Sequence, residues 1–461
     1  MRKTMLASLL LVPSLALASG YALPNSNPRD LSMCASAVAA QRDSGAAFAL
    51  PAALGRLQGP SARLGGGVVN VFDDWTDPTP GATAPPIGGA AEPGTASLSL
   101  QYTPFPNVSV SYGGKLPMLG DRGWGVGVAV QPFGGAIVKW PDDWAGRYRI
   151  TRVDREAFSG IVSAGIEVIP QVRVGGGVIY YYTMEKFTQK AWMQPYPLPA
   201  GGATNPDATA VLDLSGGAFS YDASIEIDPL RGVPLTIGVD YKHKASQHLD
   251  GDVTWTGTAP YSAGLQVPDL SALFGATTAK QTLTIPNTLN IGAAYRATKP
   301  LLVTFTYTFD RWVVYDRDLF IGNTGARIDV PRDYSNGHTF RAGAEYDFAR
   351  VWQVRVGLQR DISGLRTATY SPTLPDASSW GGSLGATYRL ARGFSLDAAV
   401  FYAKMDKVTV PSSSVGTEPR PPPPAPFGAL FPTDTFRGSY EPSALVYGLS
   451  LGWTPGARTG G

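Results

Sequence analysis

The chain alternates apolar residues with small or polar residues in repeated stretches. Between residues 351 and 363, one set is Val354, Val356 and Leu358, and the other is Arg355, Gly357, Gln359 and Asp361. Residues 301–310 repeat the pattern, with aromatic and aliphatic residues alternating with threonines. Because successive side chains of a strand point to opposite faces, each stretch predicts a strand with one apolar and one polar face.

Short turns and long loops alternate between these stretches. The predicted strands are 61–72, 96–116, 123–139, 154–168, 171–187, 215–228, 233–245, 282–296, 301–316, 337–348, 351–364, 378–390, 394–410 and 438–454. An even number of antiparallel strands, with short turns at one end and long loops at the other, is typical of a bacterial outer-membrane barrel. The sequence therefore predicts an all-β fold, a 14-stranded antiparallel transmembrane barrel whose closing strand pairs with one from the N-terminal half.

The N-terminus predicts export from the cytoplasm. Arg2 and Lys3 precede an apolar run, Met5–Leu17, and Ala16-Leu17-Ala18 is a small-residue cleavage motif. This pattern indicates a secretory signal peptide over residues 1–18. No later stretch reaches the roughly 18–20 apolar residues that a spanning helix needs.

Residues 19–60 do not follow the strand alternation. They are rich in small residues that tolerate a helix, as in Ala35–Ala40 and Ala46–Ala49. A barrel of this size has a lumen too wide for its own side chains to fill. We therefore expect residues 19–60 to form a hatch inside the lumen, residues 61–454 to form the barrel, and residues 455–461 to form a C-terminal tail.

Composition excludes several classes of partner and site. The net charge of +2 and the lack of a basic patch predict no nucleic-acid partner. A single cysteine, Cys34, cannot form an internal disulfide. The three histidines, His243, His248 and His338, are too scattered for a metal site, so no metal or other cofactor is predicted.

Catalysis finds little support in the sequence. The pattern Gly-x-Ser-x-Gly occurs around Ser383 and Ser450. A nucleophile elbow needs a strand-to-helix turn, whereas both matches lie inside alternating strands. We predict that the chain is not an enzyme. An outer-membrane lipase using Ser383, and a structural or adhesive barrel without transport, remain as alternatives.

Aromatic and large apolar residues gather at predicted strand ends and in two loops. Tyr180–Tyr182, Trp312, Tyr315 and Trp453 predict an interfacial aromatic girdle. The loops 188–214 and 246–281 hold more large apolar side chains than loops that meet only water. They predict an extracellular apolar groove, unless they merely pack the loops together. Its predicted residues are Trp192, Tyr196, Trp255, Tyr261, Leu265, Leu270, Leu273 and Phe274.

The strand 123–139 differs from the others. Pro132 removes a donor from the ladder, and Gly134-Gly135 follow Phe133 directly. Proline and paired glycines within a strand are typical of a bulge or kink. From the residues alone, a simple bend near the loop end is the favoured explanation.

Several motifs, in this order, resemble the FadL-type outer-membrane transporters, which include importers of toluene and other hydrocarbons. The matching segments are Gly20-Tyr21-Ala22-Leu23, residues 43–52, Gly123-Trp124-Gly125, Pro375-Asp376, Leu384–Tyr388 and Phe394-Ser395-Leu396-Asp397. Each motif alone is weak, but together they cover essentially the whole mature chain. One departure is Leu50, which stands where the family's hatch motif has Asn.

The resemblance implies a hatch-plugged barrel whose third strand is kinked inward. Phe133, Gly134, Gly135 and Ala136 would form the kink and a lateral opening, and Leu50, Pro51 and Ala52 the hatch gate. Long-chain fatty acids or hydrocarbons would bind at the extracellular loops and leave sideways into outer-membrane lipid. We expect passive uptake of such compounds across the bacterial outer membrane, by a protein that works as a monomer.

Overall fold

The computed structural model describes residues 27–77, 94–135, 137–191, 207–228, 232–257, 261–262, 265–266, 276–325, 327–411 and 438–455. The predicted signal peptide and the C-terminal tail beyond residue 455 lie outside these ranges. Among the described helices, none is long and apolar enough to cross a membrane.

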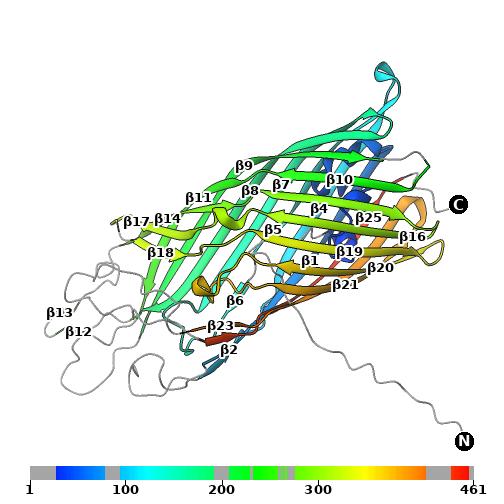
Figure 1. Ribbon diagram of the computed structural model, residues 1–461. Coiled ribbons are helices and arrows are strands. Elements are labelled where there is room, and N and C mark those ends of the chain that lie inside the picture. Colours follow the sequence, from blue (N-terminus) through cyan, green and yellow to red (C-terminus); the bar gives the residue numbers. More distant parts are fainter. Residues whose placement is uncertain are drawn as a thin grey trace, which may run out of the picture.

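Fourteen antiparallel strands close into a barrel (Figure 1). The continuous wall strands are β1 (Gly59–Phe72), β4 (Thr103–Leu116), β7 (Arg152–Ile169), β8 (Val172–Ala191), β9 (Ala208–Ile227), β20 (Trp352–Ile362), β21 (Ser379–Arg389), β22 (Phe394–Met405) and β25 (Ser443–Trp453). β1 pairs with β25 from Ala62↔Trp453 to Phe72↔Ser443, which closes the wall. Closure satisfies the backbone groups that would otherwise face lipid.

The remaining wall strands are each interrupted once. They are β5 (Arg122–Gly134) with β6 (Ile137–Lys139), β10 (Leu235–Lys242) with β11 (Ala245–Thr256), β15 (Thr288–Arg296) with β14 (Thr278–Ile285), β16 (Leu301–Asp310) with β17 (Arg317–Gly322), and β19 (Gly337–Asp347) with β18 (Arg327–Pro331). Short 3-10 turns lie at η3 (Pro117–Leu119), η4 (Trp312–Val314), η5 (Thr367–Thr369) and η6 (Ala391–Gly393).

Small sheets extend the barrel at its long-loop end. One contains β2 (Asp74–Thr76), β3 (Thr95–Ser97), β23 (Val408–Val410) and β24 (Gly438–Tyr440), and a second pairs β12 (Tyr261–Ser262) with β13 (Leu265–Gln266). The long-loop end is extracellular in outer-membrane barrels, and the short-turn end is periplasmic.

The predicted alternation is confirmed in the wall. In β20, Val354, Val356 and Leu358 are 43%, 46% and 64% exposed on the outer surface, whereas Arg355 and Gln359 are buried. The apolar outer face suits lipid, and the polar face points into the lumen.

Two predicted loops are shorter than expected, because the strands beside them continue further. β9 begins at Ala208, inside the predicted loop 188–214, and β11 extends to Thr256, inside the predicted loop 246–281. On the adjoining β11–β14 pair, Lys280 and Asp250 form an exposed ion pair of 3.2 Å. Charged outward positions remove the apolar alternation, so the sequence resembles a loop there.

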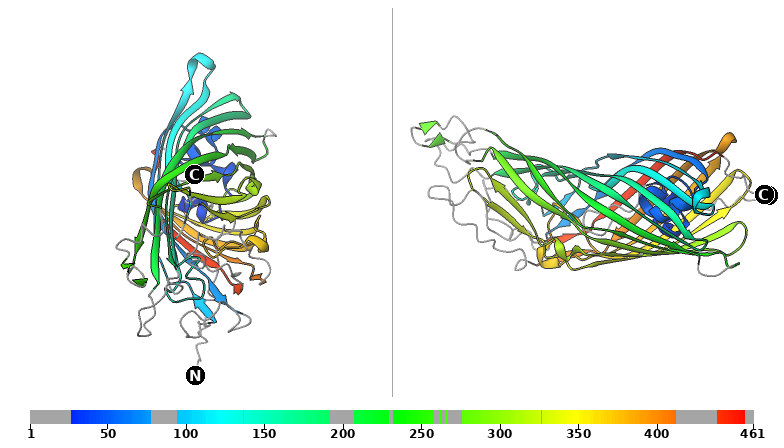
Figure 2. Two further views of the ribbon diagram at one scale, coloured as in Figure 1. Left: turned by 90° about the vertical axis from the view of Figure 1, so that its left-hand side faces the viewer. Right: turned by 90° about the horizontal axis from the view of Figure 1, so that it is seen from above.

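The described N-terminal residues 27–57, called the lumen segment below, lie inside the barrel (Figure 2). The segment contains α1 (Pro28–Leu31), η1 (Val38–Ala40), α2 (Ala46–Ala49) and η2 (Pro51–Arg56). α1 contacts β1, β21, β22 and β25, η1 contacts β10, β15 and β16, and η2 contacts β4, β5, β7, β8 and β9. The segment therefore touches the wall around the barrel.

Glycines in the wall let the lumen segment approach closely. A Cβ added to Gly165 of β7 would lie 2.2 Å from the Pro51 carbonyl oxygen, and one on Gly175 of β8 would lie 2.4 Å from the Ala52 nitrogen. At Gly160, further along β7, the nearest atom would be 3.9 Å away. The backbone contacts near η2 thus require glycine, whereas Gly160 does not have this constraint.

Buried ion pairs fasten the same segment to the wall. Arg63 of β1 binds Asp43 (2.7 Å) and also Asp397 of β22, and Arg29 binds Glu345 of β19 at 3.2 Å. Removing one partner of a buried pair leaves an uncompensated charge, which typically costs about 3–5 kcal/mol. These pairs hold the segment at the periplasmic half of the lumen.

Candidate functional site

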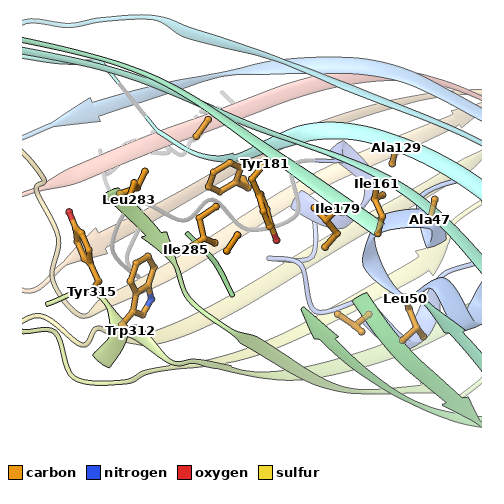
Figure 3. Close-up of a cluster of buried hydrophobic side chains, with 14 of the residues drawn as sticks. Ala47, Leu50, Ala129, Ile161, Ile179, Tyr181, Leu283, Ile285, Trp312 and Tyr315 are labelled. Atoms are coloured by element: carbon orange, nitrogen blue, oxygen red, sulfur yellow. The ribbon is translucent and has the colours of Figure 1, made fainter. Parts of the chain in front are cut away.

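An apolar lane runs along the inside of the barrel from the lumen segment toward the extracellular end (Figure 3). Its buried side chains include Ala47, Leu50, Leu54, Ala129, Phe133, Ala157, Ile161, Ile179, Tyr181, Leu214, Leu249, Leu283, Ile285, Trp312 and Tyr315. They come from the lumen segment, β5, β7, β8, β9, β11, β14 and the region around η4. Apolar side chains therefore line the inside of the wall along this lane.

The sequence analysis did not predict this lane, because side chains that face the lumen were expected to be polar. Ile161 and Ile179, opposite each other in the β7–β8 ladder, are 1% and 0% exposed. Their neighbours Val162 and Val178 are 64% and 57% exposed on the outer face. Strands that are apolar on both faces lose the alternation, and this is the signal that marks the lane.

Three residues assigned to the aromatic girdle line the lane instead. Tyr181, Trp312 and Tyr315 are 4%, 0% and 2% exposed. Tyr180 and Tyr182, next to Tyr181 in β8, are 41% and 37% exposed on the outer face. The girdle prediction is wrong for the three buried residues because strand alternation sends Tyr181 inward, while Trp312 and Tyr315 belong to the interruption between β16 and β17.

The third wall strand leaves its neighbour before its end. Pairing between β4 and β5 stops at Val108↔Val130, although β4 continues to Thr103 and β5 to Gly134. Val130 is exposed on the outer face, but Pro132, the next outward position, is buried. The strand therefore bends inward at this point.

Pairing with the fourth strand survives the bend. The β5–β7 register shifts between Pro132 and Gly134, and β6 resumes pairing at Ile137↔Asp154. Gly135 has φ of 103°, and a Cβ there would lie 2.2 Å from the Arg155 carbonyl oxygen. Glycine is thus required at Gly135 by both conformation and space. The fourth predicted kink residue, Ala136, lies outside the described residues.

Two prolines lie on the β4 edge beside the bend. The Phe105 carbonyl points toward β1, since it would lie 2.5 Å from a Cβ on Gly66. In a strand, backbone groups of adjacent residues point to opposite sides, so Pro104 and Pro106 face the separated β5. Proline has no N–H, so this edge presents fewer unpaired donors where β4 and β5 part.

The bend brings the lane to the separated strands. Phe133 is 8% exposed and packs edge-on against Tyr181, with ring centroids 4.8 Å apart. Both belong to the same apolar cluster as Leu50 and Leu54 of the lumen segment. One continuous apolar surface therefore joins the lumen segment, the bend and the upper lumen.

The predicted gate residues belong to the lumen segment and pack against the wall where the lane begins. Leu50 is fully buried and close to Gly238 of β10. Pro51 and Ala52 pack on β7 and β8, and the Ala52 N–H donates to the Ser224 hydroxyl at 2.9 Å. The residues of the segment nearest the start of β5 are Leu54 and Gly55 rather than Leu50–Ala52.

The predicted loop groove is only partly described. Trp255 lies on β11 rather than in a loop, and its indole N–H donates to the Ala276 carbonyl at 3.2 Å. Tyr261 and Leu265 belong to the small hairpin β12–β13. Trp192, Tyr196, Leu270, Leu273 and Phe274 lie outside the described residues.

A second aromatic cluster holds the chain that follows the bend. The Trp140 and Trp144 rings stack at 4.2 Å with an angle of 7°, and Trp75 meets Trp144 edge-on at 5.8 Å. Tyr440 of β24 meets Trp140 edge-on, with ring centroids 6.4 Å apart. The extracellular sheet thus fixes the segment beyond β6.

The periplasmic end below the lumen segment is polar. A cavity of about 490 Å³ there is lined by charged side chains, among them Arg29, Arg42, Asp43, Arg63, Glu345, Arg355 and Asp397.

Ser383, the nucleophile of the alternative lipase hypothesis, takes part in a structural contact. Its hydroxyl accepts a hydrogen bond from the Cys34 N–H at 2.9 Å. That contact fixes the lumen segment to β21 and has no histidine in it.

Comparison with known proteins places these features in a family. Residues 9–454 match the family model described as outer membrane protein transport protein (OMPP1/FadL/TodX). Outer membrane protein P1 of Haemophilus influenzae is 26% identical over 175 residues, which are 38% of this chain and 36% of that protein. The chain thus aligns with about a third of the length of this curated relative.

Solved structures share the fold over nearly the whole chain. A Pseudomonas aeruginosa FadL homologue has a TM-score of 0.76 at 18% identity, covering 94% of this chain and 99% of that one. The Ralstonia pickettii toluene transporter TbuX has a TM-score of 0.59 at 14% identity, covering 93% and 98%. The chain belongs to the OMPP1/FadL/TodX family of outer-membrane transport proteins.

Proposed function

We propose that this protein takes up long-chain fatty acids or hydrocarbons passively and releases them sideways, through the wall between β4 and β5, into the outer membrane. The observation that carries the proposal is that the apolar lane reaches Phe133 at the point where β5 leaves β4. A passenger can then stay on apolar surface from the upper lumen to lipid.

The energetics favour this route for an apolar passenger. Burial of a hydrocarbon chain is favourable by about 0.8 kcal/mol per CH₂, so an apolar lane stabilises a passenger that a water-filled pore would not. Straight exit to the periplasm leads into the charged cavity around Arg29, Glu345 and Arg355. Residues 19–60 act as a hatch in this proposal, held by the buried pairs of Arg29 and Arg63.

Capture begins at the extracellular end. In this proposal the passenger is bound first by the apolar residues predicted for the loop groove, among them Trp192, Tyr196, Leu273 and Phe274, which lie outside the described residues. Leu50 gives the gate an apolar side chain where the family's motif has an amide. Deposition in outer-membrane lipid then needs no periplasmic partner, and a single chain forms the complete route.

Uptake by whole cells tests the proposal. Cells without a transporter of this type, expressing this protein, should accumulate radiolabelled dodecane several times faster than cells expressing an unrelated closed barrel at equal surface abundance. Removal of residues 262–275 should lower this rate while the barrel still assembles. Accumulation no faster than with the unrelated barrel would contradict the transport proposal.

A further inference from the structure

A belt of polar side chains crosses the lumen wall next to the lane. On β9 and β10, the Lys242 ammonium donates to Asp222 (2.8 Å) and to Asp240 (2.7 Å). On β15, the Asn290 amide donates to the same Asp240 carboxylate at 3.2 Å. Asp222, Asp240 and Lys242 are 4%, 0% and 7% exposed, so water screens this group poorly.

The belt continues over the next three strands. The Thr308 hydroxyl of β16 donates to Asn290 at 2.7 Å. Arg341 of β19 donates to Thr308 and, through Nε, to Gln359 of β20 at 3.1 Å. Hydrogen bonds therefore connect the side chains of the belt at one level of the lumen, from β9 to β20. The two cations of the belt, Lys242 and Arg341, both donate hydrogen bonds within it.

Carboxylates outnumber cations in and beside the belt. Asp310 and Asp361 lie two residues beyond the belt on β16 and β20. The Thr288 hydroxyl donates to Asp310 at 2.6 Å, and the Thr339 hydroxyl donates to Asp361. Both aspartates act electrostatically on Arg341. Together with Asp222 and Asp240, the formal count is four carboxylates for two cations. With any one carboxyl group protonated, carboxylates remain in excess.

The belt also contains buried hydrogen-bond acceptors that lack a partner. Among the described residues, the Oδ1 atoms of Asp222 and Asp240 are buried and have no hydrogen-bond partner. Lys242 lies 4.7 Å from the centroid of the Phe48 ring, which packs against the lane at the lumen segment. The unpaired oxygens thus lie where the lane meets the lumen segment.

We infer that the lumen selects an uncharged passenger, a hydrocarbon or an apolar alcohol, and discriminates against a carboxylate. This inference rests on the proposed uptake function. A carboxylate at this level meets excess negative charge at low dielectric and finds Lys242 already held by two aspartates. A hydroxyl, in contrast, donates to Asp222 or Asp240 and satisfies a buried acceptor.

Two probes of equal chain length test the inference. Cells expressing the wild-type protein are given dodecan-1-ol or dodecanoate at pH 8, where the carboxyl group is ionised. The wild type should take up the alcohol about tenfold faster or more, because repulsion of one charge at this range is worth at least one pKa unit. Asp222→Asn and Asp240→Asn each remove one carboxylate and keep the side-chain shape.

Both variants should raise dodecanoate uptake several-fold and lower dodecanol uptake. The matched control is Asp213→Asn, which removes an exposed carboxylate paired with Lys186 at 3.0 Å. It should change neither rate. Two independent variants protect the test against a folding failure in one of them, and resistance of the folded barrel to unfolding in cold detergent reports assembly.

The outcomes separate the inference from the function on which it rests. Equal uptake of both probes, faster uptake of dodecanoate, or aspartate variants that leave the ratio unchanged would overturn the selection of uncharged passengers while transport stands. Uptake of neither probe above the unrelated barrel would overturn the proposed function, and the selectivity inference with it.

Discussion

Deletion of Gly134 and Gly135 should reduce hydrophobic uptake to the level of cells without the protein. Without these residues, β5 loses the left-handed position at φ of 103° and the close passage over the Arg155 carbonyl. The shortened strand can then straighten alongside β4 beyond Val108↔Val130, where the carbonyls of Pro104 and Pro106 remain as acceptors although their nitrogens cannot donate. The wall closes, and the lane ends blindly at Phe133.

The measurement is the rate of dodecane accumulation per folded barrel. A matched control deletes Asn323 and Thr324, two exposed residues of the extracellular β17–β18 turn, and should keep the wild-type rate. If the variant without Gly134 and Gly135 assembles and still imports at the wild-type rate, release does not occur between β4 and β5.

Ile179→Asn should slow uptake by about tenfold or more, because a buried amide without a partner costs about 1–3 kcal/mol and breaks the apolar lane. Ile179 is fully buried, at the middle of the β7–β8 ladder opposite Ile161. The same assay measures the rate. Ile179→Leu keeps the apolar surface and should stay within a factor of about two, as volume-conserving apolar exchanges usually do.

If the passenger moves along the lane, the uptake rate should fall in Ile179→Asn but not in Ile179→Leu. If Ile179→Asn assembles normally and imports dodecane at the wild-type rate, the passenger does not move along the β7–β8 wall. A loss shared equally by the asparagine and leucine variants would indicate a packing defect rather than a polar barrier.

The barrel is readable from the sequence because lipid and lumen impose opposite polarity on alternate residues. In β20 this rule holds along the whole strand, and in β16 it holds from Val303 onward, so these faces are predicted correctly. It fails in β7 and β8, where Ile161 and Val162 are both apolar for different reasons: one faces the lane and the other faces lipid. A single sequence cannot separate the two environments.

Some features of the candidate site can be predicted from the residues next to them in the sequence, and others cannot. Pro132 and Gly134-Gly135 mark the bend because proline and glycine act on their own backbone. The pair Arg63–Asp397 joins residues 334 positions apart, and neither residue signals its partner. The polar belt likewise depends on which strands become neighbours, so its excess of carboxylates emerges only from the folded barrel.

Photolabelling tests the lateral route most directly. A hydrocarbon carrying a diazirine is supplied to cells and activated during uptake, and labelled residues are mapped by mass spectrometry of the purified barrel. Among inward-facing positions, the label should fall on Ile161, Ile179 and Phe133. Label on Arg29, Glu345 or Arg355, in the periplasmic cavity, with Phe133 unlabelled, would show axial passage and contradict release between β4 and β5.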